Sequence, residues 1–140
     1  NGQTVTEKID NKFISVLIKL NEAKYFEEKG DIKSATAAYN YIINKYGDSK
    51  FFNHYSKFQL YLMDPAKSLS DAKKIKVLDE LSAPEGPLKL LALEQKLYIY
   101  VKNNDLENAK SQVKLILSDQ AITPEQLSRI QDVESIYELN

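Results

Sequence analysis

The residue types that could support catalysis are few and scattered along the chain. His54 is the single histidine, and the nearest carboxyl group in the sequence, that of Asp48, lies at no spacing typical of a catalytic motif. A histidine that acts as a base or a metal ligand needs a nucleophile, a carboxylate or a second ligand beside it. We therefore expect His54 to be an ordinary residue on a helix surface. Turnover that depends on His54 would be the sign of an enzyme.

Two pairs of adjacent carboxylates, Glu27-Glu28 and Asp79-Glu80, have the chemistry of a general acid and a general base. Adjacent residues of a helix point in different directions, so neither pair can converge on one substrate atom. Lysines also lie close to each pair in the sequence. Both pairs are predicted to be solvated surface.

The sequence contains no pattern for a metal, a nucleotide or another cofactor. It has no cysteine, its four glycines are isolated, and neither an EF-hand loop nor a His-Glu-x-x-His motif is present. The 19 basic and 20 acidic side chains give a net charge of −1, without the basic surplus of a nucleic-acid-binding domain. We predict a protein that is not an enzyme, binds no cofactor or metal, and has no nucleic-acid partner.

Apolar residues at spacings of three and four predict helices throughout and no strand. The first stripe, in a helix over about residues 6–29, consists of Ile9, Phe13, Val16, Leu17, Leu20, Ala23 and Phe26. Later helices are expected over about residues 33–45, 49–63, 70–81 and 87–102, then from Asp105 to Leu117, and over 123–139. Because short loops join them, residues 1–140 are predicted to be one domain.

Some positions in these helices are predicted individually. The third helix is expected to bury Phe51, Tyr55, Phe58 and Leu62. Ser70 is predicted to be an N-cap. Thr123-Pro124-Glu125-Gln126 combines a hydroxyl N-cap, a proline at the first helical position and a glutamine three residues on, as in a capping box.

The chain repeats a pattern with an offset of 74 residues. A small or apolar residue, an aromatic residue, a turn and a second helix follow one another from Ala23 to Ile42, and again from Leu97 to Ile116. Since 104 − 30 = 74, the turns at Gly30 and Asn104 are two periods of 37 apart, near the ~34-residue tetratricopeptide period. A middle turn is expected near residue 67.

This pattern resembles the tetratricopeptide repeat, although the sequence has no Trp and Lys76 stands where an aromatic residue is expected. The resemblance implies an all-α fold, a right-handed α-solenoid of about three helical hairpins with a C-terminal capping helix. It places Tyr39 and Tyr100 in the core. The residues that it projects onto a concave binding face are Leu20, Lys24, Glu27, Lys57, Tyr61, Glu94, Tyr98 and Lys102.

A narrower resemblance rests on the order of motifs: Phe-Glu-Glu-Lys-Gly-Asp closing a long first helix, then Tyr46-Gly47-Asp48-Ser49, Pro-Glu-Gly-Pro and Thr-Pro-Glu-Gln. Together these resemble the bacterial ancillary translocon-subunit family, single-span inner-membrane proteins with a periplasmic tetratricopeptide-like domain. The resemblance implies a periplasmic location and partners among translocon subunits or exported proteins. The chain begins Asn1-Gly2 without an initiator methionine, so we expect an upstream signal, anchor helix or tag to have been removed.

Alternatives remain open at this point. Other helical-hairpin repeats, such as Sel1-like repeats, fit the same periodicity. The apolar faces could serve self-association into a homo-oligomeric scaffold without a peptide groove, and a cytoplasmic location is the alternative to the periplasm.

Overall fold

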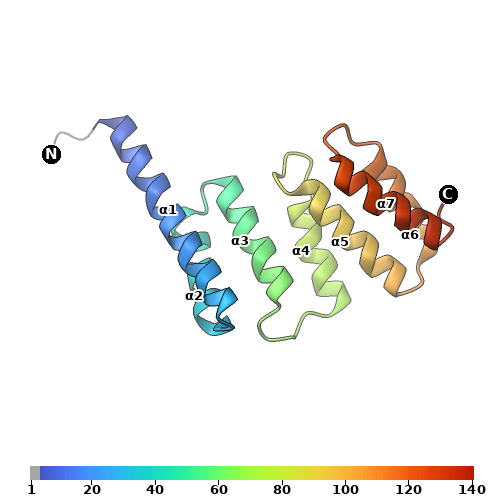
Figure 1. Ribbon diagram of the computed structural model, residues 1–140, viewed down its shortest axis with the longest axis horizontal. Coiled ribbons are helices and arrows are strands. Elements are labelled where there is room, and N and C mark those ends of the chain that lie inside the picture. Colours follow the sequence, from blue (N-terminus) through green and yellow to red (C-terminus); the bar gives the residue numbers. More distant parts are fainter. Residues whose placement is uncertain (1–3) are drawn as a thin grey trace. The chain divides into compact units, whose positions relative to one another are not determined.

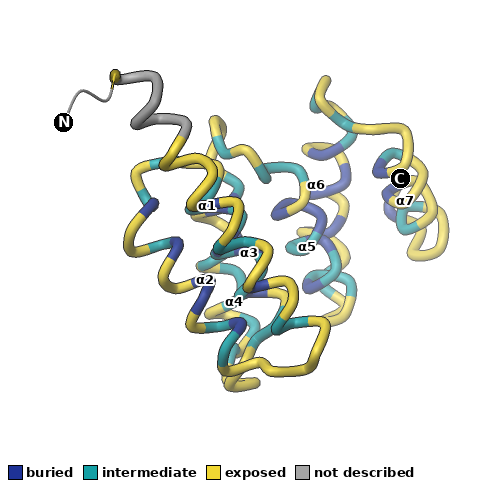
Figure 2. The backbone as a smooth tube through the Cα atoms, turned by 60° about the vertical axis from the view of Figure 1, so that its left-hand side comes forward, coloured by how far each residue is buried: buried dark blue, intermediate teal, exposed yellow. Residues whose placement is uncertain are grey.

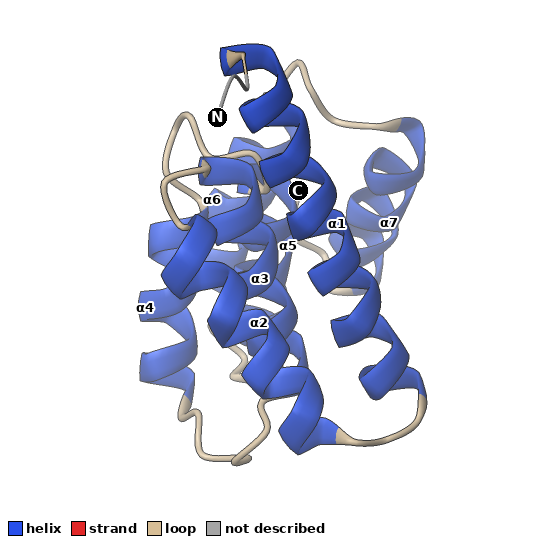
Figure 3. Ribbon diagram, turned by 90° about the vertical axis from the view of Figure 1, so that its left-hand side faces the viewer, coloured by secondary structure: helices blue, strands red, loops and turns tan. Residues whose placement is uncertain are grey.

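The computed structural model describes residues 4–140, apart from the side chains of residues 5–10. Within that range the chain forms seven α-helices joined by loops, with no strand, so the predicted all-α class is confirmed (Figures 1 and 3). The helices are α1 (Val5–Glu28), α2 (Ile32–Tyr46), α3 (Lys50–Met63), α4 (Asp71–Leu81), α5 (Lys89–Lys102), α6 (Leu106–Leu117) and α7 (Pro124–Ile136).

The helices group into two compact units. Unit 1 ends at Leu69 and contains α1, α2 and α3, and unit 2 begins at Ser70 and contains α4 to α7. In unit 1, α2 packs against both α1 and α3. In unit 2, α5 packs against α4 and α6, and α7 packs against α6. The prediction of a single domain over residues 1–140 stays a prediction.

The hairpins α1–α2 and α5–α6 close with the same backbone turn. Gly30 (φ 75°) and Asn104 (φ 55°) adopt left-handed conformations just after the first helix of each pair. The next residues, Asp31 and Asp105, donate their N–H groups to the carbonyl five residues earlier, at 2.9 and 2.8 Å. This is the Schellman arrangement, which satisfies carbonyls that the end of a helix leaves without partners. The turn therefore repeats at the offset that the sequence predicts.

Side-chain N-caps begin four of the helices. Asp31, Ser70, Asp105 and Thr123 each accept a hydrogen bond from the backbone N–H three residues further on. The predicted caps at Ser70 and Thr123 are confirmed. Each cap satisfies one of the N–H groups that the first helical turn leaves without an intrahelical partner.

The repeat register is also confirmed by burial. Four pairs of residues 74 apart are at most 1% exposed, and buried positions alternate with exposed ones along the helices (Figure 2). These pairs are Ala23 and Leu97, Ala35 and Ala109, Tyr39 and Val113, and Ile42 and Ile116. The small side chains of Ala35 and Ala109 leave room for the first helix of each hairpin to approach the second helix closely.

The predicted buried face of α3 is wrong in part, although Phe58 is buried as expected and Tyr55 is half-buried. Phe51 and Leu62 are 49% and 50% exposed, whereas His54, Phe58 and Tyr61 are buried. Positions 54, 58 and 61 share one side of a helix, because they are four and three residues apart. His54 is thus a buried residue and not the surface residue expected from the sequence. The apolar residues of α3 project from several sides of the helix, so the periodicity of the sequence alone could not identify the buried side.

Part of the predicted stripe of α1 is open. Val16 and Ala23 are buried, but Phe13 and Leu17 are 51% and 40% exposed, and the side chain of Ile9 lies outside the described residues. The length of α2 accounts for the exposure of Phe13, whereas Leu17 lies within the part of α1 that α2 can reach. Counted back from the turn, the 15 residues of α2 can lie beside α1 only as far as about residue 14, since both helices rise equally per residue.

Replacing Gly30 by Ala should lower the free energy of unfolding by about 1 kcal/mol, because alanine is strained at φ 75°. A Cβ atom there would meet nothing within 4 Å, so the cost comes from backbone strain and not from a clash. Urea unfolding followed by circular dichroism measures this cost. Gly30→Asn is the matched control, since Asn104 adopts the same conformation, and equal losses from both variants would contradict the explanation.

Candidate functional site

The five residues of unit 1 that were predicted to face a groove are placed differently from one another. Leu20 is half-buried and packs against the core of unit 1. Lys24 is exposed on α1, and Lys57 is half-buried on α3. Glu27 is also half-buried, and its Oε2 accepts a hydrogen bond from the hydroxyl of Tyr39 at 3.3 Å. Tyr61 is buried, and its ring stacks on that of Phe58 with 6.1 Å between centroids. Lys24 is thus the one fully exposed member of this set.

Tyr39 has no exposed surface, which confirms the prediction that it is a core tyrosine. Burial, together with the negative charge of Glu27, raises the pKa of the Tyr39 hydroxyl well above its usual range. The hydroxyl therefore stays protonated and donates to Glu27, so this carboxylate links α1 to α2. Tyr100, the other predicted core tyrosine, is half-buried and packs against the core of unit 2.

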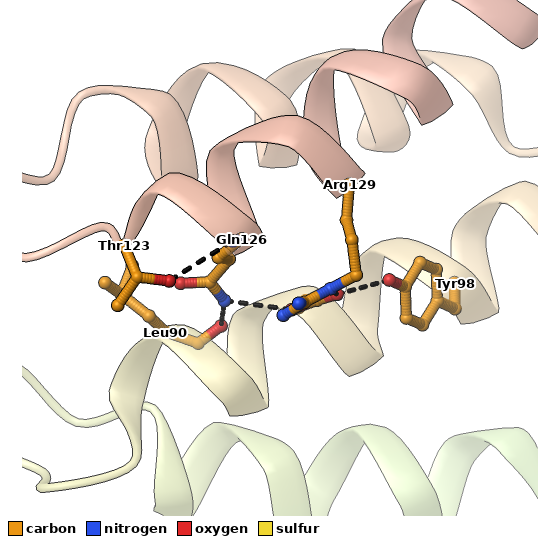
Figure 4. Close-up of polar contacts among 6 residues, drawn as sticks. Leu90, Tyr98, Thr123, Gln126 and Arg129 are labelled. Atoms are coloured by element: carbon orange, nitrogen blue, oxygen red, sulfur yellow. Dashed lines mark hydrogen bonds and ion pairs between the residues drawn. The ribbon is translucent and has the colours of Figure 1, made fainter.

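Glu94 lies inside unit 2 and not on an open face. It is 4% exposed, and the single arginine of the chain, Arg129, binds it with two hydrogen bonds, Nε to Oε2 at 2.8 Å and Nη2 to Oε1 at 2.9 Å. The Nε2 of Gln126 donates to Oε1 as well, at 2.9 Å. Figure 4 shows Gln126 and Arg129 reaching from α7 to α5. A buried carboxylate costs several kcal/mol unless it is paired in this way.

The third group at this carboxylate is the hydroxyl of Tyr98, which donates to Oε2 of Glu94 (Figure 4). Burial and this hydrogen bond raise the pKa of Tyr98 to about 12. Burial alone would raise the pKa of Glu94, but the hydrogen bonds from Arg129, Tyr98 and Gln126 outweigh it and hold the pKa below its usual value. Glu94 is therefore ionised at neutral pH, and we call these four residues the Glu94 cluster.

Lys102, the remaining predicted groove residue, forms an exposed ion pair with Asp71 of α4 at 3.0 Å. Asn103 donates to the same carboxylate at 2.9 Å. Within unit 2 the structure therefore brings Glu94 and Tyr98 together, while Lys102 joins α5 to α4. The prediction that all these residues line one binding face stays a prediction.

Sequence analysis did not single out Gln126 and Arg129 as partners of Glu94. Gln126 was read as part of a capping box, but its amide donates to the carbonyl of Leu90 at 3.1 Å and to Glu94. One signal was present, since Glu94 follows the apolar run from Leu90 to Leu93, and a carboxylate at a core-facing position needs a donor.

The open part of unit 1 is a continuous run of aromatic rings. The ring of Phe13 lies 6.0 Å from that of Phe52, which lies 5.5 Å from Phe51. Phe51 in turn stacks on Tyr55 at 6.0 Å. Phe13 and Phe51 are half-exposed, and Leu17 lies one helical turn from Phe13. We call Phe13, Leu17, Phe51, Phe52 and Tyr55 the aromatic surface.

Single exposed apolar residues are common on soluble proteins, whereas contiguous exposed patches mark binding sites. The aromatic surface is contiguous because each of its rings touches the next. Its edge carries the exposed ion pair of Lys12 with Asp48 at 2.9 Å, close in sequence to Phe13 and Phe51. An apolar centre with a polar edge is the usual composition of a protein-binding surface.

Two other kinds of site are absent from the described part of the chain, which is residues 4–140 without the side chains of residues 5–10. No helix in this range is long and apolar enough to span a bilayer. Histidine and carboxylate side chains in the same range form no group of three that could hold a metal ion. The candidate site is the aromatic surface, because its rings form a contiguous and partly exposed run.

Comparison with known proteins found no matching family model, no matching curated protein and no matching solved structure.

Replacing Arg129 by Met should lower the free energy of unfolding by about 2 kcal/mol, because it removes the cation of the pair and leaves Glu94 buried. Chemical denaturation measures the loss. Lys102→Met is the matched control, since it removes an exposed lysine–aspartate pair worth about 0.5 kcal/mol. If both variants lost the same stability, the Glu94 cluster would be no more than another surface ion pair.

The Glu94 cluster should also make stability depend on pH. The folded-state pKa of Glu94 is lowered, so its contribution is present at neutral pH and is lost as the pH falls through that value. Glu94→Gln lacks this contribution at every pH. The difference in unfolding free energy between wild type and Glu94→Gln should therefore be largest at pH 7 and shrink below about pH 4. A difference that stays constant between these values would contradict the assignment.

Proposed function

We propose that this chain is a non-catalytic protein-interaction domain that holds apolar segments of unfolded polypeptides. The observation that carries the proposal is the aromatic surface of unit 1. Its side chains are held in contact with one another but remain open to solvent at Phe13, Leu17 and Phe51. Covering such side chains with the apolar residues of a partner is favourable by about 1.5–3 kcal/mol for each one fully buried.

The size of the aromatic surface favours a flexible segment over a folded partner. A stable interface between folded proteins covers about 800 Å² of each partner, which takes roughly 20–30 residues on each side. Five side chains provide far less than that, but they suffice for one or two apolar residues of an extended chain. Aromatic rings suit varied segments, because they offer a large contact area at low cost in conformational entropy.

The finer part of the proposal rests on the resemblance to the ancillary translocon-subunit family. On that basis we propose that the chain is the periplasmic domain of a membrane-anchored bacterial protein. Its partners would be exported proteins or the translocon subunits from which they emerge. A polypeptide that leaves a secretion channel is unfolded and exposes apolar segments, so it matches the partner chemistry of the aromatic surface.

The proposal can be tested with a defined unfolded protein, reduced and carboxymethylated α-lactalbumin, by fluorescence anisotropy. Replacing both Phe13 and Phe51 by Ser should weaken binding at least about tenfold, since the two lost contacts together are worth about 1.4 kcal/mol or more. The fold should remain intact, because both side chains are half-exposed.

Ile18→Ser is the matched control for this experiment. Ile18 is 56% exposed on α1, but it lies five residues from Phe13 and so points about 140° away from it around the helix. Its replacement should leave binding unchanged. If the Ile18 variant lost as much affinity as the double variant, or if wild type did not bind the unfolded protein, the proposed function would be wrong.

A further inference from the structure

Unit 2 contains a hollow of about 420 Å³, and two members of the Glu94 cluster, Gln126 and Arg129, are among the residues that line it. It lies between the segment before and at the start of α5, residues 84–91, and the segment from the end of α6 into α7, residues 119–129. Pro84, Pro87, Leu88, Leu91 and Ala121 supply apolar walls. A volume of this order accommodates one or two amino-acid residues and lies within the range of ligand pockets.

Two cations and one anion line the hollow, namely Lys89, Arg129 and Asp119. The carboxylate that balances Arg129, that of Glu94, is 5% exposed and lies behind the guanidinium. Lys89 and Asp119 form an ion pair at 3.1 Å, and Asp119 also accepts from the N–H of Ala121 at 2.9 Å. That hydrogen bond and the charge of Lys89 keep the pKa of Asp119 below its usual value, so Asp119 is ionised at neutral pH.

Arg129 is held at the hollow with part of its donor capacity unused by Glu94. The pair with Glu94 engages Nε and Nη2, and the planar guanidinium directs its other terminal nitrogen, Nη1, away from that carboxylate. The Arg129 side chain is 48% exposed, whereas that of Glu94 is 5% exposed. The buried carboxylate thus fixes a cation that is itself half-exposed and lines the hollow.

We propose that this hollow binds the C-terminal residue of a partner polypeptide, with its apolar side chain against the apolar walls and its free carboxylate at Arg129 and Lys89. This inference rests on the proposed function and names a second feature of the partner. A polypeptide that ends in an apolar residue carries that side chain and a carboxylate on the same residue. Guanidinium and ammonium groups are the usual partners of a carboxylate in proteins.

The test uses the full chain and two acetylated pentapeptides of the same sequence, Gly-Ser-Gly-Ala-Leu, one with a free C-terminal carboxylate and one with a C-terminal amide. Titration followed by two-dimensional nuclear magnetic resonance should show the free acid binding about tenfold more tightly than the amide. The amide signals of Lys89, Ala121 and Gln126 should shift most. Equal affinity for the two peptides, or no shift with either at about 5 mM, would overturn the inference.

Three variants locate the site without disturbing the Glu94 cluster. Lys89→Met should weaken binding of the free acid about fivefold and leave the amide unchanged. Ala121→Phe, which fills the hollow from an exposed position, should abolish binding of both peptides. Lys102→Met, which breaks a comparable lysine–aspartate pair outside the hollow, should change neither, and an equal effect of the two lysine variants would count against the site.

The peptide test of the hollow and the unfolded-protein test of the proposed function can fail independently of each other. If the free acid binds preferentially but the unfolded protein does not bind through Phe13 and Phe51, the hollow stands and the aromatic surface is wrong. If the unfolded protein binds through those residues but acid and amide bind alike, the inference about the hollow alone is wrong.

Discussion

Close packing between the two helices of a hairpin is the constraint on which the rest of this protein depends. Ala35 and Ala109 have no exposed surface, and each lies in the first part of a helix that follows a turn in which Gly30 or Asn104 has positive φ. The turn brings the second helix back against the first, and the alanine allows the backbones to approach. A hairpin built in this way still has an apolar side that it cannot cover itself, so further helices must pack on it.

The two units cover the apolar side of their hairpin in different ways, and as a result their surfaces differ. In unit 1, α3 presents aromatic rings to α1, and because α2 is shorter than α1, the ring run that begins at Phe13 stays partly open. In unit 2, α7 reaches α5 through polar groups, with Glu94 as their common acceptor. Burying that carboxylate fixes Arg129 and Gln126, and these residues form part of the hollow beside α5.

Local signals in the sequence sufficed for the helices, the caps and the repeat register, because turn chemistry and helical periodicity depend on neighbouring residues. The sites depend on contacts between distant residues, and there the sequence was less informative. His54 was expected at the surface but is buried, since α3 has apolar side chains on several sides and the periodicity did not select one. Glu94 and Tyr98 were expected in an open groove, and their partner Arg129 lies 35 residues beyond Glu94, at no recognisable spacing.

The central claim is that other polypeptides bind to the aromatic surface of unit 1, at and around the exposed ring of Phe13. Photocrosslinking in the cell that produces the protein tests this most directly, with a photoreactive phenylalanine analogue at position 13 and, in a separate chain, at position 18. Mass spectrometry would identify and quantify the crosslinked proteins. The account predicts crosslinks to other polypeptides from position 13 in clear excess over position 18. Equal yields from the two positions, or crosslinks from position 13 only to copies of the same chain, would contradict it.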